Sequence, residues 1–336
     1  MSHDRTPWIS ARPLGRRAFL RATAAASAGG AALYLAGCGS SDGGSSDAGP
    51  PAAVATNTAV APAPGGIRPV LLTREFVVNE DNRFLIGLQD GDGKLVKDAT
   101  VHLRFFKIGA GGRTGSLRAE GDMQYLELNV SGAHTHDGTE GNAVTEDSVS
   151  FYAATTPFEE AGAWGVEVAV KPQAAPSSTV QLPIVVLGEP ETPSDGTLPP
   201  ASQNDTAATN TNAESLCSRD PICGLHDKVI GDVLGKGRPL VVQFSTPAYC
   251  QTRFCGPVLE VLLAQVPAYQ DRVDFVHIEV FKDFQLQQYR QAVDEWNLPG
   301  EPYTFFMSAD GTVRGRLEAI FTTGELAQKL DELVAT

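Results

Sequence analysis

Positive charge is scarce in this sequence, and the scarcity excludes one large class of partner. The 336 residues include 26 lysines and arginines against 40 aspartates and glutamates, which gives a formal net charge of −14. Nucleic acids and anionic lipid surfaces are both bound through clustered lysine and arginine side chains. We therefore expect that the protein has no nucleic acid partner.

Long hydrophobic runs are also missing. The apolar stretch at residues 22–36 is rich in alanine and is shorter than the roughly 20 residues that a membrane-spanning helix needs. Consecutive Arg16 and Arg17 precede it and resemble a twin-arginine export signal, and the tetrapeptide LAGC, which ends it at Cys38, resembles a bacterial lipobox. These resemblances imply a signal peptide over residues 1–37. They also imply a lipid on Cys38 that anchors the protein to the outer face of the cytoplasmic membrane.

Cysteine is rare too, with five residues in the whole chain. Once Cys38 is set aside for lipidation, two close pairs remain, Cys217 with Cys223 and Cys250 with Cys255. An even number of cysteines outside the cytoplasm is typical of a compartment in which disulfides form. The first pair flanks a proline-containing turn, and we expect it to form a structural disulfide. The alternative, a relay that exchanges with the second pair, stays open.

Glycine and proline, by contrast, are plentiful, at 34 and 22 residues, and they gather in two tracts. Residues 38–66 and 188–215 consist largely of small and polar residues and hold too few bulky apolar side chains to form a core. We expect a disordered tether over the first tract and a linker over the second. The linker then separates one domain at 67–187 from another at 216–336.

Short apolar runs separated by turns fill the first of these domains. About seven such runs with partial alternation are typical of an antiparallel β-sandwich, so the sequence predicts an all-β Ig-like domain over 67–187. One polar loop of this domain carries His134, His136 and Asp137, which are ligand types that copper and zinc accept. Polar loops contain such runs by chance, and no third histidine is near. We therefore assign no metal to the protein and keep these three residues as a minor candidate.

The pattern changes after residue 216. It predicts buried strands over 238–245 and 272–280, helices over 256–266 and 283–297, a strand pair around the turn at Asp310, and a final helix that begins with a capping box at Thr322 and Glu325. The resulting order of elements is βαβαββα.

This region resembles the thioredoxin superfamily. The element order matches, Cys250 and Cys255 fall between the first core strand and its helix, and a Gly-Pro pair follows the second cysteine. Pro302 matches the proline that, in this family, opens the next strand with a cis peptide bond. The resemblance implies an α/β thioredoxin-like fold, a redox-active cysteine pair, a docking groove shaped by Pro302, and no cofactor. It also implies a thiol-disulfide oxidoreductase whose partners are protein thiols or disulfides of the cell envelope.

The chemistry of helix ends supports the same activity. The start of a helix presents free N–H groups and a partial positive charge, and both stabilise a thiolate. Because Cys255 adjoins the Gly-Pro helix start, we expect it to be the attacking thiol and Cys250 to be its partner. Arg253 adds positive charge between them. Glu301, next to Pro302, is expected to raise the pKa of a nearby thiol by like-charge repulsion.

Two histidines of the C-terminal region are expected to have ordinary roles. His277 lies in the middle of a predicted strand, where a hydrogen-bonded core or edge residue is expected rather than a metal ligand or a proton donor to the thiols. His226 is expected near a helix start and is assigned no chemistry.

Three other functions stay open. A peroxiredoxin-like peroxidase would attack with Cys250, although Thr246 lies four residues before it where that family has three. A Sco-like copper-handling protein would use the same cysteines and His277, although one residue too many separates the cysteines. A non-catalytic binding protein of the envelope would keep the disulfide as a static brace and bind its partner through the sandwich.

Overall fold

The computed structural model describes residues 66–112, 114–129, 148–173, 175–249, 254–285 and 287–335. Some features that the sequence predicts lie outside these ranges. They are the signal peptide, the lipidated Cys38, the tether up to residue 65, the loop residues His134, His136 and Asp137, and also Cys250 and Arg253.

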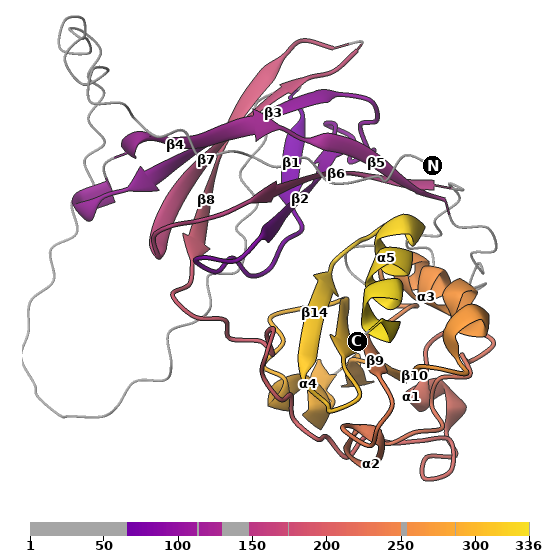
Figure 1. Cartoon of the computed structure of the whole chain (residues 1–336). Helices are drawn as coiled ribbons and strands as arrows, with labels where there is room; N and C mark the ends of the chain where they lie inside the picture. The colour runs from indigo at the N-terminus through magenta and orange to yellow at the C-terminus, as the bar shows by residue number, and fades with distance from the viewer. Residues whose placement is uncertain are drawn as a thin grey trace, which may run out of the picture.

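The N-terminal half consists of two four-stranded antiparallel sheets that face each other (Figure 1). The first sheet has the order β1-β2-β6-β5, with β1 at Arg68–Leu71, β2 at Asn82–Gln89, β6 at Ser148–Thr156 and β5 at Gln124–Asn129. The second has the order β4-β3-β7-β8, with β4 at Thr114–Asp122, β3 at Thr100–Ile108, β7 at Gly162–Lys171 and β8 at Ser178–Val186. A short 3₁₀ turn, η1, spans Ala110–Gly112.

Strict alternation places the apolar side chains of this half between the sheets. In β7 every second side chain from Trp164 to Val170 is buried, and the side chains between them are more exposed, as the two-residue period of a strand requires. Four phenylalanine rings meet at the centre in stacked and edge-to-face contacts, with centroids 5.4 to 5.7 Å apart; they are Phe76, Phe84, Phe105 and Phe158. Aromatic pairs at such distances stabilise a core beyond the area that they bury.

The C-terminal half is built on a four-stranded sheet of order β10-β9-β13-β14, with β9 at Leu240–Phe244, β10 at Asp274–Ile278, β13 at Tyr303–Met307 and β14 at Val313–Glu318. Strands β9 and β10 are parallel, and helix α3, Cys255–Tyr269, connects them. The other neighbours are antiparallel. Helix α5, Thr323–Val334, ends the fold beside α3, and it begins with the capping box at Thr322 and Glu325 that the sequence predicts (Figure 1).

The fold class predicted from the sequence requires correction, because the expected α/β thioredoxin-like fold is not the class that the structure supports. Strands make up 37% and helices 17% of the described residues, so the structure is β-rich. The helix expected over 283–297 is largely absent: a two-stranded ribbon of β11, Phe281–Asp283, and β12, Gln288–Tyr289, leads into the five-residue α4, Gln291–Glu295. The remaining helices, α1 at Ala213–Leu216 and α2 at Ile230–Val233, are single turns.

The two halves share a second core, which explains the nearly continuous apolar sequence of β2. Phe84 and Ile86 face the inside of the sandwich, whereas Leu85 faces the C-terminal half. There it belongs to one cluster with side chains of β5, β6, α3 and α5. Arg83 crosses the same boundary and donates hydrogen bonds to both carboxylate oxygens of Glu325, at 2.9 and 2.8 Å.

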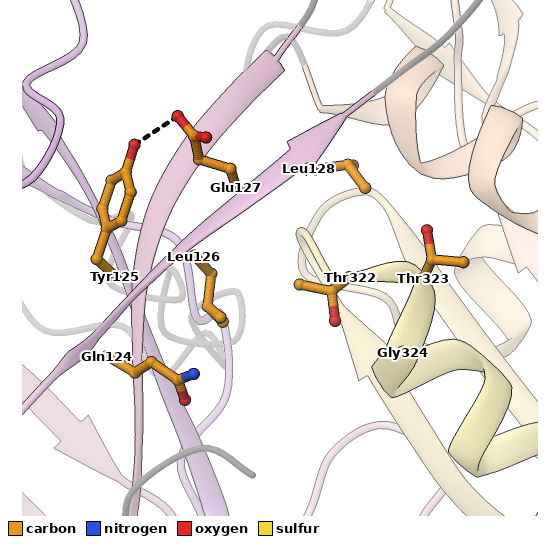
Figure 2. Close-up of a pocket in the computed structure, with 8 residues that line it drawn as sticks. All are labelled: Gln124, Tyr125, Leu126, Glu127, Leu128, Thr322, Thr323 and Gly324. Atoms are coloured by element: carbon orange, nitrogen blue, oxygen red, sulfur yellow. Dashed lines mark hydrogen bonds between the residues drawn. The ribbon is translucent and has the colours of Figure 1, made fainter. Parts of the chain in front are cut away.

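A pocket marks the edge of this boundary and is lined by Gln124–Leu128 of β5 and by residues 322–324 at the start of α5. Figure 2 shows Leu126 and Leu128 directed toward α5, while Tyr125 points away and donates a hydrogen bond to Glu127 at 2.6 Å. The lining holds no group suited to nucleophilic or metal chemistry on the side that faces α5. We regard the pocket as part of the contact between the two halves and not as a functional site.

The segment at 188–215, expected to be a linker, is hydrogen-bonded to both halves. Glu75 of the N-terminal half accepts hydrogen bonds from the backbone N–H and the hydroxyl of Thr192, at 3.2 and 3.1 Å. Further along, Trp296 donates from its indole nitrogen to the hydroxyl of Ser202 at 3.1 Å. The segment is therefore part of the packed structure. Among the described residues no helix has the length and apolar character needed to cross a membrane.

Candidate functional site: a buried Cys/His cluster beside an oxidised cysteine

The described residues with reactive or metal-binding side chains lie at one end of the C-terminal sheet, where β9 ends. In the parallel pair, His277 of β10 lies beside Gln243 of β9. In the antiparallel pair, Tyr303 lies beside Phe244, which brings Glu301 and Pro302 to the same end of the sheet. From Phe244 the chain continues to the start of α3 at Cys255.

Cys255 is oxidised and fully buried. It takes part in a disulfide, and its side chain has no exposed surface. The other cysteines in the described part of the chain are free thiols, so the partner of Cys255 lies outside the described residues. The Cys255 sulfur is therefore sealed from solvent in the oxidised form, and the expectation that Cys255 is the attacking thiol stays a prediction.

The Glu301–Pro302 peptide bond is cis, as the sequence predicts. Burial raises the pKa of the Glu301 carboxyl to about 7, and the negative charge of nearby Glu279 contributes to the increase. Glu301 therefore holds a proton over much of the range below neutral pH. Its carboxyl is a possible proton donor at the strand end that leads to Cys255.

The predicted disulfide between Cys217 and Cys223 is wrong. Both residues are buried free thiols, and their sulfur atoms lie 3.9 Å apart, whereas a disulfide bond is about 2.0 Å long. Two imidazole rings share the space around them, those of His226 and His277. The four residues are named the Cys/His cluster below.

The ligand atoms of the Cys/His cluster converge on one point, and all lie within 4.8 Å of one another. The Cys223 sulfur is 3.1 Å from Nε2 of His226 and 3.3 Å from Nδ1 of His277. The Cys217 sulfur is 3.8 Å from the same Nδ1. The two ring nitrogens are 3.3 Å apart. All four side chains are buried, so the cluster is closed to solvent.

The orientation of His277 is fixed from the side opposite the sulfurs. Its Nε2 lies 3.0 Å from the backbone carbonyl oxygen of Ser245 and 3.0 Å from the hydroxyl of the same residue. A carbonyl oxygen can only accept a hydrogen bond, so Nε2 carries a proton and donates it. In the neutral ring Nδ1 then has a lone pair directed at the two sulfurs and His226.

The short segment Cys223–His226 forms a tight turn that directs both of its side chains into the cluster. The backbone N–H of Leu225 donates a hydrogen bond to the Cys223 sulfur, and the backbone N–H of His277 donates to the carbonyl oxygen of Leu225 at 2.9 Å. This second bond attaches the turn to β10. The sequence spacing of two residues between Cys223 and His226 is short enough for one turn to supply two ligands.

The charges within the cluster are strongly coupled. The contact between the sulfurs lowers the pKa of Cys217 and raises the pKa of Cys223, because the pair shares one proton. Burial lowers the pKa of His226. Burial also acts to lower the pKa of His277, but the Cys217 thiolate outweighs it, so this pKa is raised.

Hydrogen bonds connect the cluster to the segment before Cys255. The backbone N–H of Ser218 donates to the buried Glu279 carboxylate at 2.7 Å, and its hydroxyl accepts from the backbone N–H of Ala248 at 3.1 Å. Arg219 pairs with Glu260 of α3 at 2.6 Å. The residues that follow the first cluster cysteine thus contact both the approach to Cys255 and the helix that Cys255 begins.

Sequence reasoning found the four members of this cluster separately and did not combine them. The close spacing of the two cysteines favours a disulfide between them, and the position of His277 in mid-strand favours a hydrogen-bonded core or edge residue. One local signal was available, namely the Cys-x5-Cys-x2-His spacing over Cys217–His226. The fourth member comes from β10, which only the pairing of β9 with β10 brings close.

Comparisons with known proteins add no assignment. No protein-family model matches the chain, and no curated protein matches it. Among solved structures, the ZirS C-terminal domain matches 49% of this chain and 99% of that chain, with 9% sequence identity and a TM-score of 0.19. A likeness of this degree carries no argument about fold or function.

Proposed function

We propose that the protein is a thiol-disulfide oxidoreductase of the cell envelope, held to the membrane through a lipid on Cys38 and active on protein thiols or disulfides. The observation that carries the proposal is an oxidised cysteine at the first position of a 15-residue helix. A helix start lowers the cost of forming a thiolate when such a bond opens. The sequence supplies Cys250 as the partner sulfur, with four residues between it and Cys255.

From the burial of Cys255 we infer that Cys250 is the sulfur that a substrate attacks. A substrate thiolate attacks the sulfur of Cys250 and forms a mixed disulfide, and Cys255 leaves as a thiolate. A second substrate thiol then releases Cys250, so that the substrate loses two electrons and two protons and the protein gains both. Glu301, whose pKa is raised to about 7, lies at the same end of the sheet, and we propose its carboxyl as the source of the proton that the departing Cys255 thiolate takes up.

Trapping with single-cysteine variants tests this assignment. Cys255→Ser should leave Cys250 able to hold a protein as a mixed disulfide, and Cys250→Ser should hold none. The protein used is the full chain, reduced and then mixed with a model disulfide substrate. Capture by neither variant, under conditions in which the reduced wild type reacts, would contradict the proposal.

One observation favours a second function, a non-catalytic binding protein with a static disulfide. Cys255 is sealed from solvent, as the sulfurs of structural disulfides often are. The reduction potential of the bond separates the two functions, because structural disulfides have potentials below about −300 mV and exchanging ones have higher values.

A further inference from the structure

We propose that the Cys/His cluster binds one Zn²⁺ ion through Cys217, Cys223, His226 and His277. This site is separate from the oxidised Cys255 and does not require the proposed exchange activity. Two thiolates and two imidazoles are a ligand set that zinc takes in closed structural sites.

Five of the six distances between the ligand atoms are close to the edges of a zinc tetrahedron. With Zn–S bonds of about 2.3 Å and Zn–N bonds of about 2.05 Å, a regular tetrahedron has a sulfur–sulfur edge of about 3.8 Å, sulfur–nitrogen edges of about 3.6 Å and a nitrogen–nitrogen edge of about 3.3 Å. The sulfur–sulfur and nitrogen–nitrogen edges here are 3.9 and 3.3 Å. Three of the four sulfur–nitrogen edges are 3.8, 3.1 and 3.3 Å, and the fourth, between Cys217 and His226, is at most 4.8 Å. The other five edges differ from the ideal by about 0.5 Å or less.

The surroundings hold the ligands in the orientation that a metal requires. A histidine that binds a metal usually donates its other ring N–H to a carbonyl or carboxylate oxygen, and Ser245 accepts that hydrogen bond from His277. The N–H of Leu225 supports the Cys223 sulfur from outside the cluster. These contacts fix both ligands before a metal arrives.

Charge balance selects zinc among the metals that accept sulfur and nitrogen. Two thiolates neutralise Zn²⁺, whereas Cu⁺ in the same place would leave one negative charge in a buried site, which is costly. Cu²⁺ prefers a tetragonal arrangement, and this one is tetrahedral. Binding replaces the thiol protons, so each ion bound to two thiols releases two protons.

Four protein ligands leave no open position for water or substrate, so the ion has a structural role. It joins the segment 217–226 to β10. Through Ser218 and Ala248 the same segment contacts the approach to Cys255. Loss of the ion should therefore loosen that approach as well.

Metal content of the full chain tests the site. Protein purified without added metal, or loaded with Zn²⁺ alone and freed of excess, should hold one zinc per chain. Co²⁺ in place of zinc should give the intense visible bands and the sulfur-to-metal charge-transfer band of a tetrahedral site with two thiolates. This readout uses the wild-type chain, so it does not depend on whether a ligand variant folds.

Matched variants locate the ion. Cys217→Ser and His277→Ala should each reduce the zinc content at least tenfold under a competing chelator, while His102→Ala, at an exposed histidine of the sandwich, should leave it unchanged. Cys255→Ser should also keep its zinc, which separates this test from that of the exchange activity. The proposal is overturned by a chain that binds neither Zn²⁺ nor Co²⁺, by a disulfide between Cys217 and Cys223 in the purified protein, or by preferential binding of Cu⁺ over Zn²⁺.

Discussion

The two halves of the molecule bury their interiors by different means. The N-terminal half closes two sheets over apolar and aromatic side chains, and no cysteine occurs among its described residues. The C-terminal half buries the Cys/His cluster and the carboxyl groups of Glu279 and Glu318, whereas Glu75, the buried acid among the described residues of the N-terminal half, pairs with Arg316 across the boundary. Apolar contacts depend little on metal, redox state or pH, whereas buried sulfur and carboxyl groups depend on all three. We therefore expect apolar packing to set the stability of the N-terminal half, and metal binding, redox state and pH to affect the stability of the C-terminal half.

The largest expected effect is the loss of a cluster ligand. His277→Ala removes a metal ligand and leaves a cavity in β10, and we expect the free energy of unfolding of the C-terminal half to fall by at least about 4 kcal/mol. Denaturant unfolding with and without a chelator measures it. A chelator should lower the free energy of unfolding of the wild type and leave that of the variant unchanged. An equal decrease in both proteins would contradict the assignment of His277 as a metal ligand.

A core substitution in the sandwich provides the opposite case. Phe84 is fully buried among three other phenylalanine rings, so Phe84→Ala should cost about 3–5 kcal/mol. Zinc content and the sensitivity of the C-terminal half to a chelator should not change. A variant that loses its metal would show that packing inside the sandwich and metal binding in the C-terminal half are coupled.

The boundary between the halves should respond more weakly. Arg83 donates to Glu325 and, at 2.6 Å, to the backbone carbonyl of Ile320. Arg83→Ala should cost about 1–3 kcal/mol because a half-buried carboxylate and a carbonyl lose their donor. A double-mutant cycle with Glu325→Gln measures the share due to the ion pair, and a coupling energy near zero would assign the contact to packing alone.

A further expected effect concerns pH. The pKa of Glu301 is raised from 4.5 to about 7 in the folded protein, chiefly by burial, with Glu279 and His277 as its charged neighbours. A raised pKa means that the folded state holds the proton more tightly. Its contribution to stability is complete below a pH of about 4.5 and is lost as the pH rises through about 7.

Glu301→Gln should remove this part of the pH dependence of the free energy of unfolding and leave the parts due to other groups in place. Stability curves measured between pH 4.5 and 8 at constant salt give the comparison. Identical curves for the variant and the wild type would show that Glu301 does not titrate in this range. Exchange by the proposed pair should show the same loss of pH dependence in the variant.

Much of the local structure could be predicted from the sequence, because local physics decides it. The capping box at Thr322 and Glu325 and the parallel buried strands β9 and β10 follow from residue types and spacing. The helix expected over 283–297 does not form as predicted because Phe281, Phe284 and Tyr289 stack with one another and with Tyr249. Tertiary contacts of this kind override helix propensity.

The Cys/His cluster shows why the rest could not be predicted. His277 is 51 residues from His226 in the sequence, and only the pairing of β10 with β9 and the turn at Cys223–His226 bring the two rings together. The cysteine count favours a disulfide because two close thiols usually form one in a protein expected to be exported. The histidine that completes the cluster comes from a distant strand, and a single sequence does not show that contact.

Native mass spectrometry of the full chain tests the central claim most directly, since it reports bound metal and disulfides in one mass. We expect the mass of one zinc ion per chain and of one disulfide. Cys217 and Cys223 should become reactive toward alkylating reagents only after the metal is removed. A chain without metal that carries two disulfides, one of them between Cys217 and Cys223, would contradict it.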